Sequence, residues 1–417
     1  MIDLIPLAVL GSASIIMRKI YKSWLAPGAF FPLAWFFYIL MPMVFAPGFP
    51  YYYFGLWVIT AIALAFSAGS LLAFNEDEDL KSENSKMVKT ISEYKSIISY
   101  STLIMTCLSL LGVILLLRFS LEKFQMNYSL FSLFALPSNI TADRYNALLA
   151  YPIYLKFFLY FLFPASLVAG IGYSLTNRKL HFLYLSPLFV AVLKGTLETT
   201  RSTILLSVIL WMAGFAGGRV ITRNRLHRLV EKKLFIFITL FGILFIFLFI
   251  ALQWLREAGG EILFLVMVKR IKLYFFGYLS AFTIWIENIQ ASSLTLGMTT
   301  FAGPFNALGL IDRELGFYSH TFIHDGSYTN VYTALRGLIR DYSIIGSIIV
   351  CMVAGFLSTI SYYKSLRGFI FWLMPLTMFY SFTLYSPLIS VFHYNSIILA
   401  WFIVFTIFFI KPKQSMI

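Results

Sequence analysis

Long apolar runs separated by short polar segments dominate the chain and predict membrane-spanning helices. A helix needs about 20 largely apolar residues to cross a bilayer, and about eleven runs approach that length. They lie near residues 2–17, 26–46, 51–74, 97–118, 153–175, 180–198, 202–218, 234–252, 338–360, 369–386 and 389–410. The first run lacks a basic start and a small-residue cleavage pattern, so it predicts a retained helix rather than a signal peptide. The pattern predicts an all-α, polytopic transmembrane helix bundle.

Two segments between the predicted helices, 119–152 and 253–337, are too long for simple turns, and their sequences are not typical of solvent-exposed loops. The second contains apolar stretches broken by Lys269, Arg270 and Lys272. As one spanning helix it would place three cations near mid-membrane, each costing about 2.5 to 3.5 kcal/mol. We therefore predict that 262–286 is interfacial or re-entrant. The predicted organisation is one integrated membrane domain, with helices 1–8 in 1–252, a large loop in 253–337 and helices 9–11 in 338–417.

Composition excludes a soluble protein. Hydrophobic residues make up 60% of the 417 positions and charged residues 12%, with a mean hydropathy of +0.83, whereas a globular domain carries about 25% charged residues. The net charge of +14 comes from short clusters between apolar runs, which is typical of membrane loops and not of nucleic-acid binding. Cys107 and Cys351 both lie within apolar runs, so we expect them to be small buried side chains and not to form a disulfide.

Alternate loops differ in charge, which predicts the orientation. Lys and Arg gather in alternate loops, with Glu231 as the acid beside them, at Arg18, Lys19, Lys22, Arg178, Lys179, Arg219, Arg223, Arg225, Arg228, Lys232, Lys233, Lys364, Arg367, Lys411 and Lys413. Positive loops stay in the cytoplasm. The N-terminus is thus predicted to be periplasmic and the C-terminus cytoplasmic, in a bacterial inner membrane. The long loop 253–337 then lies outside.

Ionisable residues at the predicted outer face are the candidate functional groups, because polar groups at membrane depth are costly. In the turn between the sixth and seventh helices, Lys194 either pairs with Glu198 or, with Arg201, contributes to anion binding. Arg336 and Arg340 stand at i and i+4 on one helical face. They either pair with Asp341 or converge on a diphosphate.

The outer histidines are candidates for proton transfer. His320 and His324 have the i, i+4 spacing that metal sites use, but further ligands are missing nearby, so no metal and no cofactor is predicted. A neutral imidazole that accepts a proton from a hydroxyl is the preferred interpretation. His393 and Tyr394 lie in a tyrosine-rich turn between the last two helices. That turn is suited to sugars, although interfacial tyrosines are common in any membrane protein.

Part of the chain, from about 194 to 355, resembles the bacterial oligosaccharide repeat-unit polymerases, the O-antigen polymerases of the Wzy type. Residues 199–206 resemble the family's Arg-containing turn into an aliphatic helix, and residues 274–282 its aromatic loop segment. The run from Asn330 through Tyr332 to Arg336, followed by 340–346, resembles its Asn-x-Tyr-Thr and Asp-Phe-Gly-x-x-Gly segment. The chain lacks an Arg with Gly eleven positions later, a pattern found in some members.

The resemblance implies a fold similar to the GT-C glycosyltransferases and a metal-independent glycosyl transfer at the periplasmic face. A glycan would leave its polyprenyl diphosphate and join a hydroxyl of an incoming lipid-linked repeat unit, in surface polysaccharide or lipopolysaccharide biosynthesis. A flippase and a chain-length regulator are the implied partners, besides the membrane and both lipid-linked glycans. The proposed base is His324 with Asp325, then His320, then Asp341. Substrate-binding candidates are Arg201, Arg270, Asn330, Tyr332, Arg336, Arg340, His393 and Tyr394.

Two alternative functions remain open. An O-antigen ligase has a similar many-helix body and large outer loop. A lipid-linked oligosaccharide flippase or other transporter favours internal repeats and polar residues near mid-membrane, whereas the ionisable groups here collect at one face. The absence of a Walker A loop removes the usual support for ATP-driven transport.

Overall fold

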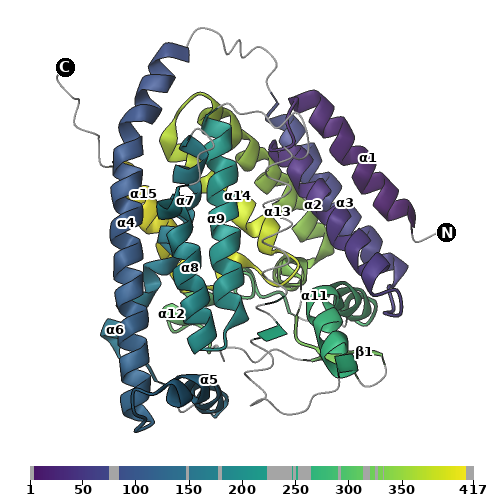
Figure 1. Cartoon of the computed structure of the whole chain (residues 1–417). Helices are drawn as coiled ribbons and strands as arrows, with labels where there is room; N and C mark the ends of the chain where they lie inside the picture. Colours follow the sequence, from purple (N-terminus) through teal and green to yellow (C-terminus); the bar gives the residue numbers. More distant parts are fainter. Residues whose placement is uncertain are drawn as a thin grey trace. The chain divides into compact units, whose positions relative to one another are not determined.

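The computed structural model describes residues 4–74, 84–146, 150–176, 181–222, 247, 250–251, 264–289, 293–312, 320–324, 327–331 and 333–409. These residues are mostly helical (Figure 1) and form two compact units. The first comprises described parts of 1–87 and 264–398, and the second described parts of 88–222, 247–251 and 399–409. Both units combine segments that are distant in sequence. The predicted boundaries at 252 and 337 remain predictions.

The first unit contains the N-terminal helices and most of the C-terminal third. Its elements are α1 (Leu4–Tyr21), α2 (Pro27–Phe45), α3 (Tyr53–Leu72), α11 (Phe264–Glu287), α12 (Ala302–Ala307), β1 (Thr321–His324), β2 (Ser327–Thr329), α13 (Ala334–Leu366), η1 (Ile370–Trp372), α14 (Leu373–Tyr385), η2 (Val391–His393) and the start of α15 (Asn395–Phe409). The second contains most of α4 (Asn84–Lys123), α5 (Leu130–Tyr145), α6 (Ile153–Tyr160), α7 (Leu162–Leu175), α8 (Phe182–Leu197) and α9 (Arg201–Ile221).

Seven described helices are long and apolar enough to cross a membrane, which confirms a multi-pass helical membrane protein. They are Leu4–Tyr21, Pro27–Phe45, Tyr53–Leu72, Tyr94–Lys123, Ile153–Leu175, Arg201–Ile221 and Ala334–Leu366. Three shorter apolar helices, Phe182–Leu197, Ile370–Tyr385 and Asn395–Phe409, coincide with further predicted runs. The predicted run 234–252 lies almost entirely outside the described residues. The count of eleven therefore stays a prediction.

Small residues let helices pack backbone to backbone in both units. In the first, a Cβ on Gly69 of α3 would fall on the backbone of Met352 in α13, and one on Gly355 would fall on the Phe66 carbonyl. In the second, Gly170 of α7 meets the Trp211 backbone of α9 in the same way. Because lipid is as apolar as Leu, close van der Waals packing is a main source of association between membrane helices. We call the α3–α13 contact the glycine seam.

The helix α11 is continuous from Phe264 to Glu287, and its C-terminal half packs on α2 and on the connection between α2 and α3. The Tyr278 hydroxyl donates to the Tyr38 carbonyl at 2.6 Å, and Ser280 Oγ donates to the Pro50 carbonyl at 2.7 Å. Lys269, Arg270 and Lys272 in the N-terminal half are exposed. The first contact lies in the middle of α2 and the second in the connection between α2 and α3, and the interfacial position of 262–286 remains a prediction.

The long helix α13 is interrupted, which the sequence pattern did not predict. Ser343 has φ 65° and ψ 178°, so a short segment up to residue 342 precedes a longer one. Ser343 Oγ accepts a hydrogen bond from the Gly346 backbone N–H at 3.3 Å. A serine in this position is a favoured helix N-cap, so the second segment starts with its own cap.

Candidate functional site

The buried Asp341 carboxylate holds the loop that precedes α12. Its Oδ1 accepts a hydrogen bond from the Thr299 backbone N–H at 2.9 Å and its Oδ2 one from Thr300 at 2.7 Å. The Thr295 hydroxyl also donates to Oδ1. Asp341 is fully buried. Both carboxylate oxygens are therefore already occupied as hydrogen-bond acceptors. This geometry favours an anchoring role over that of a general base.

Arg336 lies on the first segment of α13 and stacks on an aromatic ring. Its guanidinium carbon is 4.8 Å from the ring centroid of Trp285, near the end of α11. The segment starts with Thr333 as N-cap, whose Oγ1 accepts from the Arg336 backbone N–H, and the Ala334 N–H donates to the Ser386 carbonyl at 2.7 Å. The Arg336 side chain is half-buried, whereas Arg340 is exposed. The predicted convergence of the two arginines on one anion stays a prediction.

A short antiparallel hairpin carries His320 and His324, where a loop was expected. Phe322 pairs with Tyr328 across the strands, and both side chains are exposed, at 70% and 52%. The exposed His320 ring lies 4.7 Å from the Tyr328 ring. Because side chains alternate along a strand, Ile323 points the other way and is buried, and a Cβ on Gly277 of α11 would lie 3.3 Å from its Cδ1. The hairpin thus presents an aromatic face with an imidazole at its edge.

The tyrosine-rich turn before α15 is part of the packed interior of the first unit. His393 is 5% exposed and Tyr385 is 3% exposed. The Tyr385 and Tyr394 hydroxyls lie 3.3 Å apart. A Cβ on Gly303 of α12 would lie 2.7 Å from the His393 carbonyl, so α12 covers this turn. The buried positions favour the structural interpretation of His393, and Tyr394 is half-buried beside it.

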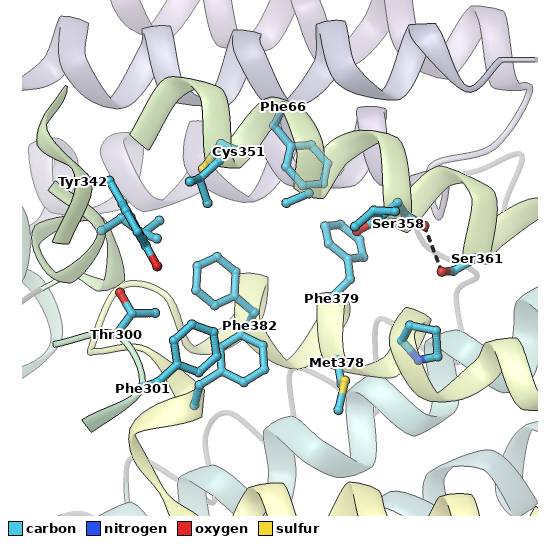
Figure 2. Close-up of a pocket in the computed structure, with 16 residues that line it drawn as sticks. Phe66, Thr300, Phe301, Tyr342, Cys351, Ser358, Ser361, Met378, Phe379 and Phe382 are labelled. Carbon is cyan, nitrogen blue, oxygen red and sulfur yellow. Dashed lines mark hydrogen bonds between the residues drawn. The ribbon is translucent and has the colours of Figure 1, made fainter. Parts of the chain in front are cut away.

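An apolar cavity of about 280 Å³ lies between α13 and α14. Figure 2 shows Cys351 and Ser358 of α13 facing Phe379 and Phe382 of α14 across it. The cavity begins beside the loop that Asp341 holds, at Thr300, Phe301 and Tyr342, and ends near Ser361 and Pro375. We call it the α13–α14 groove.

In the second unit, the turn between α8 and α9 confirms the pairing alternative for Lys194. Its Nζ lies 2.7 Å from Glu198 Oε2, and both side chains are largely buried. Thr200 Oγ1 donates to the same carboxylate oxygen at 3.2 Å. Arg201 begins α9 and is half-buried. It belongs to the second unit, whereas the other candidate arginines belong to the first.

Within the first unit, α11 and α13 bring several of the predicted residues onto one scaffold. The hairpin with His320 and the Trp285–Arg336 pair both pack on α11, and the exposed Asn330 connects the hairpin to α13. Arg270 is exposed on the same helix, nearer its start. Asp325, Tyr332 and the side chain of His324 lie outside the described residues. Within the described part of the chain, no group of three His, Cys, Asp or Glu side chains could hold a metal ion.

Sequence reasoning missed Trp285, the threonines that bind Asp341 and the groove. Trp285 lies near the end of an aromatic-rich apolar stretch, where interfacial aromatic residues are common, so the local sequence does not indicate its cation partner. The groove residues do repeat at i, i+3, i+4 and i+7 on α13 and α14. That pattern is shared by ordinary helix-packing faces, so it cannot predict a cavity.

We compared the chain with protein-family models, with curated proteins and with solved structures, and none of the three comparisons found a match.

Proposed function

We propose that the protein joins polyprenyl-diphosphate-linked oligosaccharide repeat units at the outer face of the bacterial inner membrane. One observation carries this proposal beyond the resemblance. The imidazole-bearing hairpin packs at Gly277 of α11, and Arg336 packs at Trp285 of the same helix. At about 1.5 Å of rise per residue, these two positions on α11 are about 12 Å apart along the helix axis. A sugar and the diphosphate attached to it extend over a comparable distance.

The chemistry needs a cation for the leaving group and a base for the acceptor. The acceptor hydroxyl oxygen would form a bond to the anomeric carbon of the donor glycan. The bond from that carbon to the diphosphate oxygen would break, and polyprenyl diphosphate would leave with the bonding electrons. Arg336, with Arg340 and Arg270, would stabilise the developing negative charge. The hydroxyl proton would pass to an imidazole, either His320 or His324.

The aromatic face of the hairpin supports sugar binding next to that base. Phe322 and Tyr328 are exposed side by side. Exposed aromatic rings offer apolar contact area at low entropic cost, because their side chains have few rotatable bonds. Asp341 is not the base in this proposal, because its oxygens already accept hydrogen bonds from Thr295, Thr299 and Thr300.

Purified protein in lipid nanodiscs, mixed with a lipid-linked repeat unit, should produce a ladder of longer glycans and free polyprenyl diphosphate. Absence of both products under every acceptor condition would contradict the polymerase proposal. In cells, loss of a polymerase leaves single repeat units on the lipid A core, whereas loss of a ligase leaves none. Transport of the repeat unit into vesicles without polymer formation would favour a flippase instead.

Arg336 offers a sharper test with a matched control on the same helix. Arg336→Ala should reduce the rate of ladder formation about 100-fold or more, as loss of a charge-stabilising donor does. Arg336→Lys keeps the charge, so its rate of ladder formation should lie between those of the wild type and of Arg336→Ala. Lys364, near the other end of α13, also contacts an aromatic ring, with its Nζ 5.6 Å from the Phe369 centroid. Lys364→Ala should leave the rate unchanged, and an equal loss in both alanine variants would remove Arg336 from the site.

The base is tested with glutamine variants of the outer histidines. Loss of a general base typically costs about 100-fold to 10,000-fold in rate. His320→Gln or His324→Gln should show that loss together with a changed pH–rate profile. The exposed His181, before α8 in the second unit, supplies the control. Normal rates in both outer variants would exclude imidazole as the base.

A further inference from the structure

The α13–α14 groove is bounded by two apolar helix faces. On α13 the lining residues after the break recur at helical spacing from Val350 to Ser361, and on α14 from Pro375 to Phe382. Phe66 of α3 and Phe392 of η2 add further aromatic rings. The described residues of its lining include no charged side chain. A ligand here must therefore be apolar along most of its length.

The groove is long and has one open side. Along the unbroken segment from Val350 to Ser361 the helical rise corresponds to about 16 Å, roughly half the thickness of a bilayer's hydrocarbon core of about 30 Å, and Tyr342 extends the lining beyond the break. Leu357 lines the cavity and is 54% exposed, so the groove opens along the surface of α13. An apolar chain can thus enter from the side, without passing through an aqueous opening.

Polar groups occur where the groove begins, at the end predicted to face outward. Thr300 is 3% exposed, and its Oγ1 is buried without a hydrogen-bond partner among the residues that the structure describes. The Tyr342 hydroxyl lies at the same end (Figure 2), and a Cβ on Gly297 would lie 2.9 Å from it. Gly297 has φ +96°, so a glycine is favoured there for both its backbone and this approach. A buried hydroxyl left unpaired is costly, and a ligand oxygen at this end would satisfy it.

We propose that the groove holds the polyprenyl chain of the glycan carrier, with the chain's phosphate end at Thr300 and Tyr342. This inference rests on the proposed function. A single groove accommodates a single chain, which matches a polyprenyl carrier and not a phospholipid with two acyl chains. The aromatic lining offers ring faces to the branched methyl groups and double bonds of an isoprenoid. Asp341 supports the site indirectly, because it holds the backbone of Thr300.

Photo-crosslinking in nanodiscs tests the groove directly. The full-length protein is irradiated with a polyprenyl phosphate that carries a diazirine on its chain and no glycan, and the labelled peptides are identified by mass spectrometry. Label should map to α13 and α14 residues that line the groove. Unlabelled polyprenyl phosphate should compete, and phosphatidylglycerol should not. Label elsewhere, or equal competition by phosphatidylglycerol, would overturn the inference.

Neighbouring positions on α13 provide matched variants. Ala354 lines the groove, whereas Val353 is exposed and does not line it. Ala354→Trp should reduce groove labelling about tenfold or more, because it displaces several methylene groups of the chain. Val353→Trp should label like the wild type. The wild-type map alone can refute the proposal if Ala354→Trp fails to fold.

Ladder formation is measured on the same samples, so the two proposals fail in different ways. A normal ladder without label in the groove would overturn the groove assignment and leave the polymerase proposal standing. Specific groove labelling without any ladder would instead overturn the polymerase proposal.

Discussion

Two faces of α13 are built differently. Toward α3, the glycine seam brings the backbones together at Gly69 and Gly355, and Ser70 Oγ and Thr359 Oγ1 lie 2.7 Å apart within it. Toward α14, aromatic and sulfur-containing side chains surround an open cavity. The same helix thus packs tightly on one side and leaves space on the other. Since the residues around that space are themselves apolar, the cavity results from the arrangement of the two helices and not from a lack of apolar side chains.

The largest effect is expected from a bulky residue in the seam. Gly355→Leu would place side-chain atoms on the Phe66 carbonyl, so the helices must separate. We expect a loss of unfolding free energy of about 3 kcal/mol or more, at the upper end for overpacking. Ala354→Leu, one residue away in the groove, should cost less than about 1 kcal/mol. Thermal unfolding in detergent measures both, and equal losses would contradict the distinction between the two faces.

A smaller effect is expected at the mouth of the groove. Asp341→Asn removes the charge that binds Thr299 and Thr300 and turns an amide donor toward their N–H groups. We expect a cost of about 2 kcal/mol, in the range for hydrogen bonds to a charged group. Amide hydrogen exchange at 299 and 300 should accelerate. The exposed Asp312 supplies the control, because Asp312→Asn should change neither stability nor exchange at these amides.

The break in α13 should contribute less. Ser343→Ala removes the cap of the second segment and leaves a Cβ at φ 65°, for a cost of about 1 to 2 kcal/mol. Ser343→Gly also removes the hydroxyl, but a glycine tolerates both the cap position and this backbone conformation. We therefore expect it to lower the free energy of unfolding by only a few tenths of a kcal/mol. Urea or thermal titrations measure the difference. If the glycine variant were the less stable one, the assigned capping role would be wrong.

The smallest effect is expected from a single hydroxyl in the seam. Thr359→Val removes the contact with Ser70, whose hydroxyl still lies 2.9 Å from the Tyr21 hydroxyl. We expect a loss of about 0.6 kcal/mol, as measured for buried hydrogen bonds between membrane helices. Ser358→Ala, at the neighbouring groove position, should be closer to neutral. A larger loss at Ser358 than at Thr359 would show that the groove hydroxyl contributes more than the seam.

The arrangement of the candidate residues in space was not predictable from the sequence. Spacing along the chain predicted that Arg336 and Arg340 share one helical face, and the charge pattern predicted that they lie with His320 on the outer side, which remains a prediction. It could not show that Arg336 stacks on Trp285, or that Asp341 binds amides more than 40 positions earlier in the chain. The hairpin was also missed, although Asp325 and Gly326 form a dipeptide typical of tight hairpin turns.

The sequence by itself determined the helical membrane architecture of this protein, because a chain in lipid must satisfy its backbone hydrogen bonds within each segment. Local hydrophobicity is therefore sufficient to locate the long apolar helices, although not α5 and α12, and the charged loops between them predict a direction. Tertiary structure alone decided which face of α13 is sealed, where the helix breaks and where a cavity remains. These features depend on contacts between residues that are distant in sequence, such as Gly69 with Met352 and Thr300 with Asp341. No local pattern encodes such contacts.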